Sequence, residues 1–176
     1  MQRAATDPAA FKDLFERYYP RAVNVAYRML GDRDQAEDIA MEAFAKIYEA
    51  RDSYRASATF STFLHRVISN LCLNAARRRR VVLEEPLEPE RAADDSCDPA
   101  SAVQRAELAC AVRAAVLSLP PNQRLALVLT RYEQMSYQAA ADAMNVSVGA
   151  LESLLHRAKA NLRKSLSKFA GSDEIF

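Results

Sequence analysis

Three groups of polar and charged side chains are the candidates for chemistry in this sequence. The first is the acidic group Glu37, Asp38 and Glu42, the second is the arginine run 77–80, and the third is a polar and basic set within residues 147–164. Clustered carboxylates attract basic protein surfaces, whereas arginine and amide side chains bind phosphates and base edges. The chemistry that these groups indicate is recognition of a protein and of a nucleic acid.

Catalysis and metal binding have little support. The two histidines, His65 and His156, belong to no Ser-His-acid order, and the sequence has no glycine-rich phosphate loop and no metal-ligand cluster. The cysteines Cys72, Cys97 and Cys110 are odd in number, far apart and without a C-x-x-C pair, so we expect reduced thiols without a special role. No catalytic residue, metal ligand or cofactor is predicted.

The C-terminal group follows the pattern of a helix-turn-helix. A short alanine-rich helix is predicted from Tyr137 to Met144, and after a tight turn Ser147 can cap a longer helix with a buried stripe from Leu151 to Leu166. In this motif the second helix enters the major groove, although an ordinary solvated helical hairpin is the alternative. The side chains that must then point outward are Gly149, Ala150, Glu152, Ser153, His156 and Arg157, and the basic face continues with Lys159, Arg163 and Lys164.

The arginine run closes a second predicted helix, whose apolar residues recur at helical spacing over 60–75. Asn70 and Asn74 lie one turn apart on the same face of this helix, and Tyr54 lies in the polar stretch before it. Basic charge beside amide and aromatic side chains suits unpaired DNA, because arginines hold the backbone while other groups receive bases. Taken alone, a charge run is usually just solvated.

The acidic group lies on and beside the exposed face of the most regular amphipathic helix, over residues 36–48. Carboxylates early in a helix stabilise its dipole, which would be a sufficient reason for them. An acidic, partly apolar face also offers a dock for a basic protein partner.

Composition favours an all-helical chain, since half of the residues are apolar and only three are glycine. A first helix is expected over 11–30, kinked or restarted at Pro20 and ended by Gly31-Asp32. No apolar stretch approaches the ~20 residues of a membrane helix, and no signal peptide is recognised, so the expected location is the cytoplasm.

Charge divides the chain into three parts. Residues 1–80 hold 14 Lys and Arg against 10 Asp and Glu, and residues 108–176 hold 8 against 5. Between them, residues 81–107 hold 2 basic and 8 acidic residues, and the proline-rich stretch 81–101 has no helical period. We therefore expect two small helical domains, 1–80 and 102–176, joined by an acidic linker over 81–101.

These motifs resemble a known family. Residues 11–80, with AEDIAMEAF and TFSTFLHRVISNLCLNAARRRR, resemble the sigma-2 domain of bacterial sigma factors. Residues 117–166, with LPPNQRLALVL, SYQAAADAMNVS and VGALESLLHRAKANLR, resemble the sigma-4 domain. A chain with these two domains and a short linker is similar to the extracytoplasmic-function (ECF) group of alternative sigma factors, which bind core RNA polymerase and direct it to promoters.

The resemblance implies a role for each group. The acidic group would dock on the β′ clamp helices, the sigma-4-like domain would contact the β flap, and the linker would enter the polymerase toward its active site. An anti-sigma factor clamped between the domains is a further implied partner. The −10 element would be recognised and melted by Tyr54, Asn70, Asn74, Arg77 and Arg78. The −35 element would be bound by Ser147, Glu152, Ser153, His156 and Arg157, with Arg124 holding a phosphate.

Two other functions are compatible with parts of the sequence. A sigma mimic that sequesters an anti-sigma factor without binding DNA is favoured by Glu152 and Leu154, which stand where the family often has basic residues. The run 77–80 and Arg157 argue against it, because a mimic does not need them. A conventional helix-turn-helix repressor would leave residues 1–80 without a purpose. Promoter-dependent transcription with core polymerase separates the three.

Overall fold

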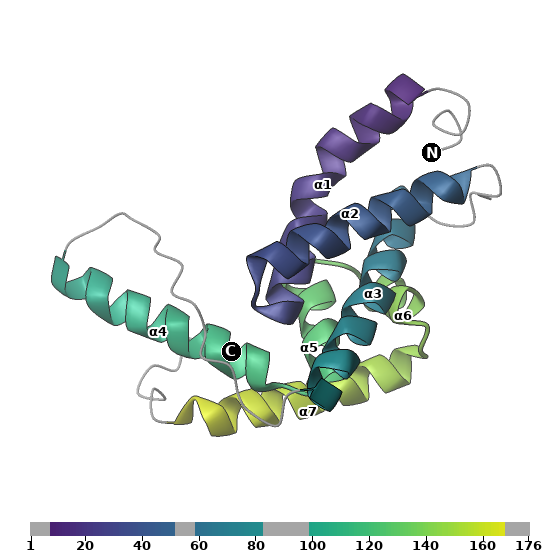
Figure 1. Ribbon diagram of the computed structural model, residues 1–176. Helices are drawn as coiled ribbons and strands as arrows, with labels where there is room; N and C mark the ends of the chain where they lie inside the picture. Colours follow the sequence, from purple (N-terminus) through teal and green to yellow (C-terminus); the bar gives the residue numbers. More distant parts are fainter. Residues whose placement is uncertain (1–7, 52–58, 83–98, 168–176) are drawn as a thin grey trace.

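The computed structural model describes residues 8–51, 59–82 and 99–167, and every regular element in these ranges is a helix (Figure 1). The predicted all-α class is confirmed. Tyr54 and residues 83–98 of the expected linker lie outside the described residues. In chain order the helices are α1 Pro8–Leu30, α2 Arg33–Glu49, α3 Phe60–Val82, α4 Pro99–Ser118, α5 Pro121–Leu127, the π-helix η3 Val128–Tyr132, α6 Tyr137–Met144 and α7 Val148–Ser165.

Helix α1 continues through Pro20, so the restart considered from the sequence does not occur. Pro20 lies on the exposed side of the helix, and its missing N–H removes one intrahelical hydrogen bond. The next turn is held by buried side chains, among them Ala22, Val25 and Ala26. Packing of this apolar face compensates for the missing bond, because tertiary contacts supply most of a helix's stability.

The turn between α1 and α2 is as expected. Gly31 ends α1 with φ +75°, and the Asp32 carboxylate accepts a hydrogen bond from the Gln35 N–H at 3.0 Å, capping α2. A Cβ at Gly31 would also lie 2.7 Å from a methyl group of Leu117. The positive φ is the main reason for glycine here, and the Leu117 side chain would have to move to admit a Cβ.

The two groups of helices, named here the N-terminal domain (α1–α3) and the C-terminal domain (α4–α7), share one hydrophobic core. Met29 and Ile68 of the first domain belong to the same buried cluster as Leu129 and Leu151 of the second. Helix α6 lies against α3, and α7 runs along the lower edge of the molecule in Figure 1. The closed packing of the two domains is thus a feature of the fold itself.

A second, smaller cluster belongs to the C-terminal domain alone. Val116 of α4 and Leu127 of α5 pack with Ala158 and Leu162 of α7, and Leu166 extends the contact. This cluster holds the later half of α7 while its first half joins the shared core. The predicted buried stripe of α7 is confirmed, because Leu151, Leu155, Ala158, Leu162 and Leu166 are all buried.

Candidate nucleic-acid interface

Helix α7 begins at a well-defined capped turn. Asn145 ends α6 in the left-handed conformation (φ 55°, ψ 47°), which asparagine tolerates better than most residues. Ser147 then accepts a hydrogen bond from the Ala150 N–H at 3.2 Å, as the predicted cap requires. The helix-turn-helix geometry is therefore fixed by local hydrogen bonds at the start of the second helix.

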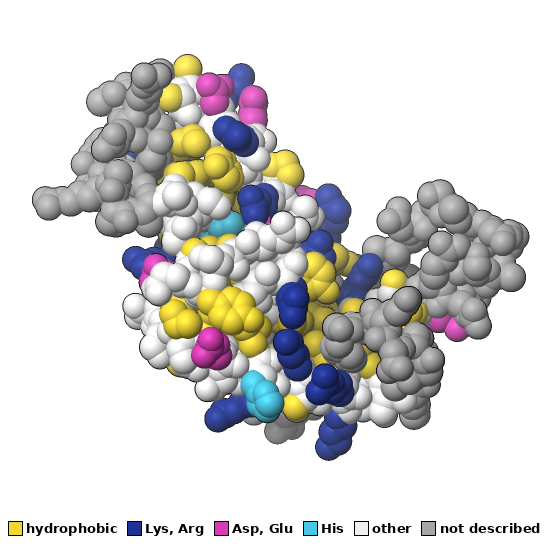
Figure 2. Space-filling view, turned by 180° about the vertical axis from the view of Figure 1, so that it is seen from behind, with side chains coloured by type: hydrophobic (Ala, Val, Ile, Leu, Met, Phe, Trp, Pro, Cys, Tyr) yellow, Lys and Arg dark blue, Asp and Glu magenta, His cyan; other side chains and the backbone are white. Residues whose placement is uncertain are grey.

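The outward face of α7 is polar, as the sequence predicts. Glu152, Ser153, His156 and Arg157 are exposed and, with Gly149, line a shallow hollow. The Ser153 hydroxyl donates to the Gly149 carbonyl at 2.9 Å, so its oxygen remains an acceptor toward the outside. Lys and Arg side chains gather over the lower part of the molecule in Figure 2. Such a face can meet phosphates and base edges.

A second polar face lies on α3. Asn70, Asn74, Arg77 and Arg78 are all exposed, and the first three lie on the side of the helix opposite the buried Ile68. The structure thus brings together the four described candidates for −10 contacts on one helix. Amide and guanidinium groups arranged in this way can bind a nucleic-acid backbone and bases.

The acidic group lies on the outer side of α2. Glu37 pairs with Arg33 at 3.1 Å, whereas Glu42 pairs with Lys46 at 3.4 Å, both between residues one turn apart. Asp38 is exposed between them. Exposed pairs of this kind contribute little to stability and exchange partners easily, so the carboxylates stay accessible to an incoming basic surface.

Arg124, for which the resemblance implies a phosphate contact, binds main-chain carbonyls in this structure. Its guanidinium donates to the main-chain oxygens of Leu117 and Leu119, the latter at 3.0 Å, and to that of Met29 across the domain boundary. A guanidinium has five N–H donors in a fixed fork, which suits several carbonyls at once. In this structure Arg124 therefore joins the α4–α5 turn to the end of α1, and it does not extend the face of α7.

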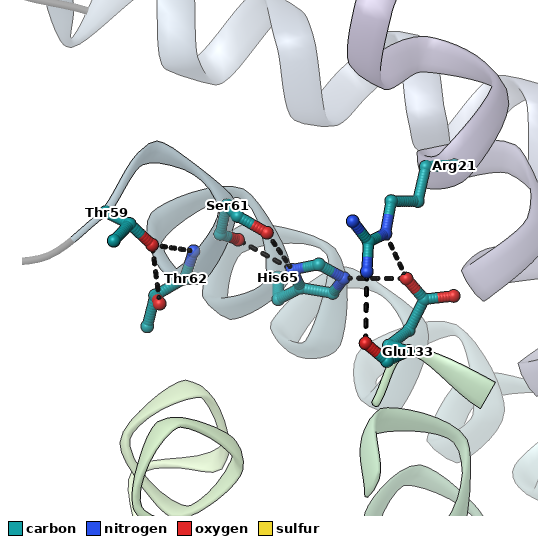
Figure 3. Close-up of polar contacts among 6 residues, drawn as sticks. All are labelled: Arg21, Thr59, Ser61, Thr62, His65 and Glu133. Carbon is teal, nitrogen blue, oxygen red and sulfur yellow. Dashed lines mark hydrogen bonds and ion pairs between the residues drawn. The ribbon is translucent and has the colours of Figure 1, made fainter. Parts of the chain in front are cut away.

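A buried polar cluster that the sequence does not reveal joins the two domains (Figure 3). Glu133, which follows η3, receives hydrogen bonds from Arg21 of α1 on its carboxylate and, at 3.0 Å, on its main-chain oxygen. Nε2 of His65, on α3, lies 3.3 Å from the same carboxylate. The Glu133 side chain is only 7% exposed, and that of His65 only 1%.

The hydrogen-bond geometry of His65 restricts its ring. Nδ1 lies 2.6 Å from the Ser61 carbonyl, which only accepts, so Nδ1 donates there. Nε2 faces the Glu133 carboxylate, to which it can bond as a donor. Burial alone would raise the pKa of Glu133, but the hydrogen bonds and charges of His65 and Arg21 outweigh it and hold that pKa below its usual value.

Potential metal ligands are dispersed over the described part of the chain. No group of His, Cys, Asp and Glu in these ranges is arranged to hold a metal ion. Within the same ranges no helix is long and apolar enough to cross a membrane.

Burial raises the pKa of the Cys72 thiol to about 12, which makes it an inert core residue.

The fold consists of two small helical domains. One carries a helix-turn-helix and the other a polar, arginine-rich helix, which is the arrangement of a DNA-binding protein. Comparison with known proteins makes the class specific. Residues 14–81 match Sigma-70 region 2, and residues 111–162 match Sigma-70, region 4. The first match falls within α1–α3, and the second runs from the end of α4 into α7.

Full-length relatives agree with these matches. The chain is 32% identical over 171 residues to the ECF RNA polymerase sigma factor SigW of Bacillus subtilis, covering 91% of this chain and 90% of that protein. It is also 32% identical to the RNA polymerase sigma-H factor of Pseudomonas aeruginosa, covering 91% and 88%. The chain belongs to the ECF family of RNA polymerase sigma factors.

Solved structures share the fold. The sigma factor RpoE in complex with the anti-sigma factor NepR from Bartonella quintana has a TM-score of 0.70 at 22% identity, covering 90% of this chain and 97% of that one. CnrH in complex with the cytosolic domain of CnrY has a TM-score of 0.69 at 26% identity, covering 94% of both chains. Both share the fold of this chain and are in complex with another protein.

Proposed function

We propose that this chain is an alternative sigma factor that binds core RNA polymerase in the cytoplasm and directs it to specific promoters. The observation that carries the proposal is the presence of two exposed polar faces, on α3 and on α7, in a chain of the ECF family. Its parts are a −10 domain over 1–80, an acidic linker over 81–101 and a −35 domain over 102–176. No catalytic residue and no cofactor take part in this function.

Docking on polymerase is assigned to the acidic face of α2. Glu37, Asp38 and Glu42 lie beside Met41, whose side chain is 53% exposed although it is apolar. An acidic rim with an apolar contact at its centre suits a basic protein surface, which in this family is that of the β′ clamp helices. The C-terminal domain is assigned to the β flap.

Promoter recognition is divided between the domains. On α3, Asn70, Asn74, Arg77 and Arg78 are assigned to the −10 element together with Tyr54, and the exposure of the first four supports this. The −35 element is assigned to the face of α7. Its contacts are Ser147 at the helix start and Glu152, Ser153, His156 and Arg157 on the outward face.

An anti-sigma factor is the proposed regulatory partner. The support is the likeness to RpoE bound to NepR, which extends over 90% of this chain. The sequestering sigma mimic remains the second candidate, because Glu152 is exposed on the face that would meet DNA and its charge repels phosphates. Leu154 favours it less, since it is half-buried and packs against the shared core.

Transcription in vitro separates the two functions. Core polymerase with this chain is tested on a pool of promoter fragments from the genome that encodes it. Specific initiation supports the sigma factor, whereas binding of an anti-sigma factor without initiation at any fragment supports the mimic. The exposed Arg157 and the α3 face lead us to expect initiation.

A further inference from the structure

The outward face of α7 contains one acidic residue. The helix carries Arg157, Lys159, Arg163 and Lys164 as basic residues, and Glu152 is its single carboxylate. The Glu152 side chain is exposed, and its carboxylate forms no ion pair and no hydrogen bond with any described residue. A contact within the described part of the fold therefore does not account for an acid on a face that is proposed to meet DNA.

Glu152 lies in the part of α7 that would contact base edges. The helix begins at Val148, so Glu152 is in its second turn, and it lines the shallow hollow together with Gly149 and Ser153. The space beside Gly149 is open, since a Cβ built there would contact no described side chain beyond its chain neighbours. Base edges can approach the carboxylate from this side, and in a recognition helix the N-terminal residues are the ones that contact them.

Bringing a carboxylate close to DNA is unfavourable unless the DNA offers it a hydrogen-bond donor. Phosphates repel it, and guanine N7 and O6 and thymine O4 are acceptors like the carboxylate itself. The donors in the major groove are the amino groups of cytosine and adenine. The adenine amino group lies between two acceptors, its own N7 and thymine O4, whereas the cytosine amino group has an acceptor on one side only. Cytosine is therefore the base that suits Glu152 best.

Arg157 supplies the complementary contact on the same face. Its guanidinium can donate to O6 and N7 of guanine, which a carboxylate cannot bind. Glu152 and Arg157 are five positions apart in the helix, which corresponds to about 7.5 Å along its axis, or about twice the 3.4 Å rise between base pairs. The two side chains therefore read different base pairs, and each can set the preference at a position of its own.

We propose that Glu152 reads a cytosine of the −35 element by accepting a hydrogen bond from its N4 amino group. This inference rests on the proposed function as a sigma factor, and it names one base of the sequence that the α7 face recognises. Thymine and guanine at the same place present an acceptor to the carboxylate, so both are rejected. Glu152 thus lowers the general attraction to phosphates and raises the selectivity of the helix.

The test uses the full chain assembled with core RNA polymerase. Promoter fragments randomised over the −35 region are selected by binding and sequenced, and affinities are then measured for fragments that differ at one base pair. The variants are Glu152→Ala and Glu152→Gln, which leave the packing of α7 intact because the side chain is exposed. The matched control is Glu107→Ala, which removes the same charge from an exposed position on α4.

Wild type and control should select cytosine at one position, with an advantage of about tenfold or more over the other bases. Glu152→Ala should lose the preference at that position alone, and it should bind fragments with the other bases more tightly than wild type does. Glu152→Gln should move the preference from cytosine to adenine, because a carboxamide can bond to N6 and N7 of adenine together. The preference set by Arg157 should be unchanged in both variants.

Other results contradict the proposal in distinct ways. If Glu152→Ala tightens binding to all fragments equally and leaves the selected sequence as it is, Glu152 only repels phosphates. If neither variant changes the selected sequence or the affinities, Glu152 does not meet DNA. A different base at the position that depends on Glu152 overturns the assignment to cytosine. If wild type and control select no −35 sequence at all, the proposed function fails, and base reading by Glu152 fails with it.

Discussion

Arg66 on α3 donates two hydrogen bonds to the main-chain oxygen of Asp142, 76 residues later in the chain. Asp142 lies near the end of α6, where the last carbonyls of a helix have no partner within it. The Asp142 oxygen also accepts a long hydrogen bond, 3.3 Å, from the Asn145 N–H at the end of α6. The guanidinium adds two shorter bonds to it and favours the negative end of the helix dipole. One side chain of the first domain in this way caps a helix of the second.

The acidic face of α2 gives the first prediction. Reversing Glu37, Asp38 and Glu42 to lysine places like charges against a basic surface, which costs several kcal/mol, so affinity for core polymerase should fall by more than about 100-fold. A binding titration measures it, and circular dichroism should be unchanged because these side chains do not pack in the core.

The control for this variant reverses three exposed acids on other helices, Asp13, Glu16 and Glu107. It makes the same change of net charge away from α2. An equal loss of polymerase affinity in variant and control would mean that overall charge matters and that α2 is not the docking face.

Local structure was largely predictable from the sequence. The Ser147 cap, the glycine stop at Gly31 and the buried stripe of α7 each follow from residues within a few turns of one another. The domain interface was not predictable, because Arg21 and Glu133 are 112 residues apart and neither belongs to a motif. The contacts of Arg124 were not predictable either. The segment LPPNQR indicates the start of a helix, but it does not reveal the carbonyls that Arg124 binds.

Arg124 gives the second prediction. Arg124→Lys keeps the positive charge but loses the fork that binds several carbonyls, so buried acceptors are left without a donor. The free energy of unfolding should fall by about 1–3 kcal/mol, as measured by denaturant titration. Arg131→Lys, at an exposed position one helical segment later, serves as control and should change it little. A stable Arg124→Lys chain with weaker DNA binding would restore the phosphate role.

The lowered pKa of Glu133 gives the third prediction. The pKa of a glutamate in an unfolded chain is about 4.3, so the stabilisation from the charged, paired carboxylate is fully present above that pH. It is lost as the pH falls through the lower folded value, because protonation removes the charge that faces Arg21 and His65. Denaturant midpoints measured from pH 5 down to pH 3 should decrease more steeply in wild type than in Glu133→Gln. Parallel curves would show that Glu133 is not the group responsible.

The recognition helix gives the fourth prediction, which weighs two parts of α7 against each other. Arg157 is exposed beside His156 on the face that lines the shallow hollow, whereas Arg163 and Lys164 lie in the last turn. A recognition helix reads bases with its earlier residues, and its end has usually left the groove and can meet only phosphates. Arg157→Ala should therefore cost on the order of 1–3 kcal/mol at the best −35 sequence and relax the preference among variants.

Replacing Arg163 and Lys164 with alanine should instead weaken binding to all −35 sequences alike and lower the salt slope by about one for each phosphate that is no longer neutralised. Binding curves on a small panel of −35 variants at two salt concentrations measure both effects, with each variant serving as the control for the other. If Arg157→Ala weakens every sequence equally, Arg157 binds a phosphate. Base reading then falls to Glu152, Ser153 and His156, the other exposed side chains of the same face.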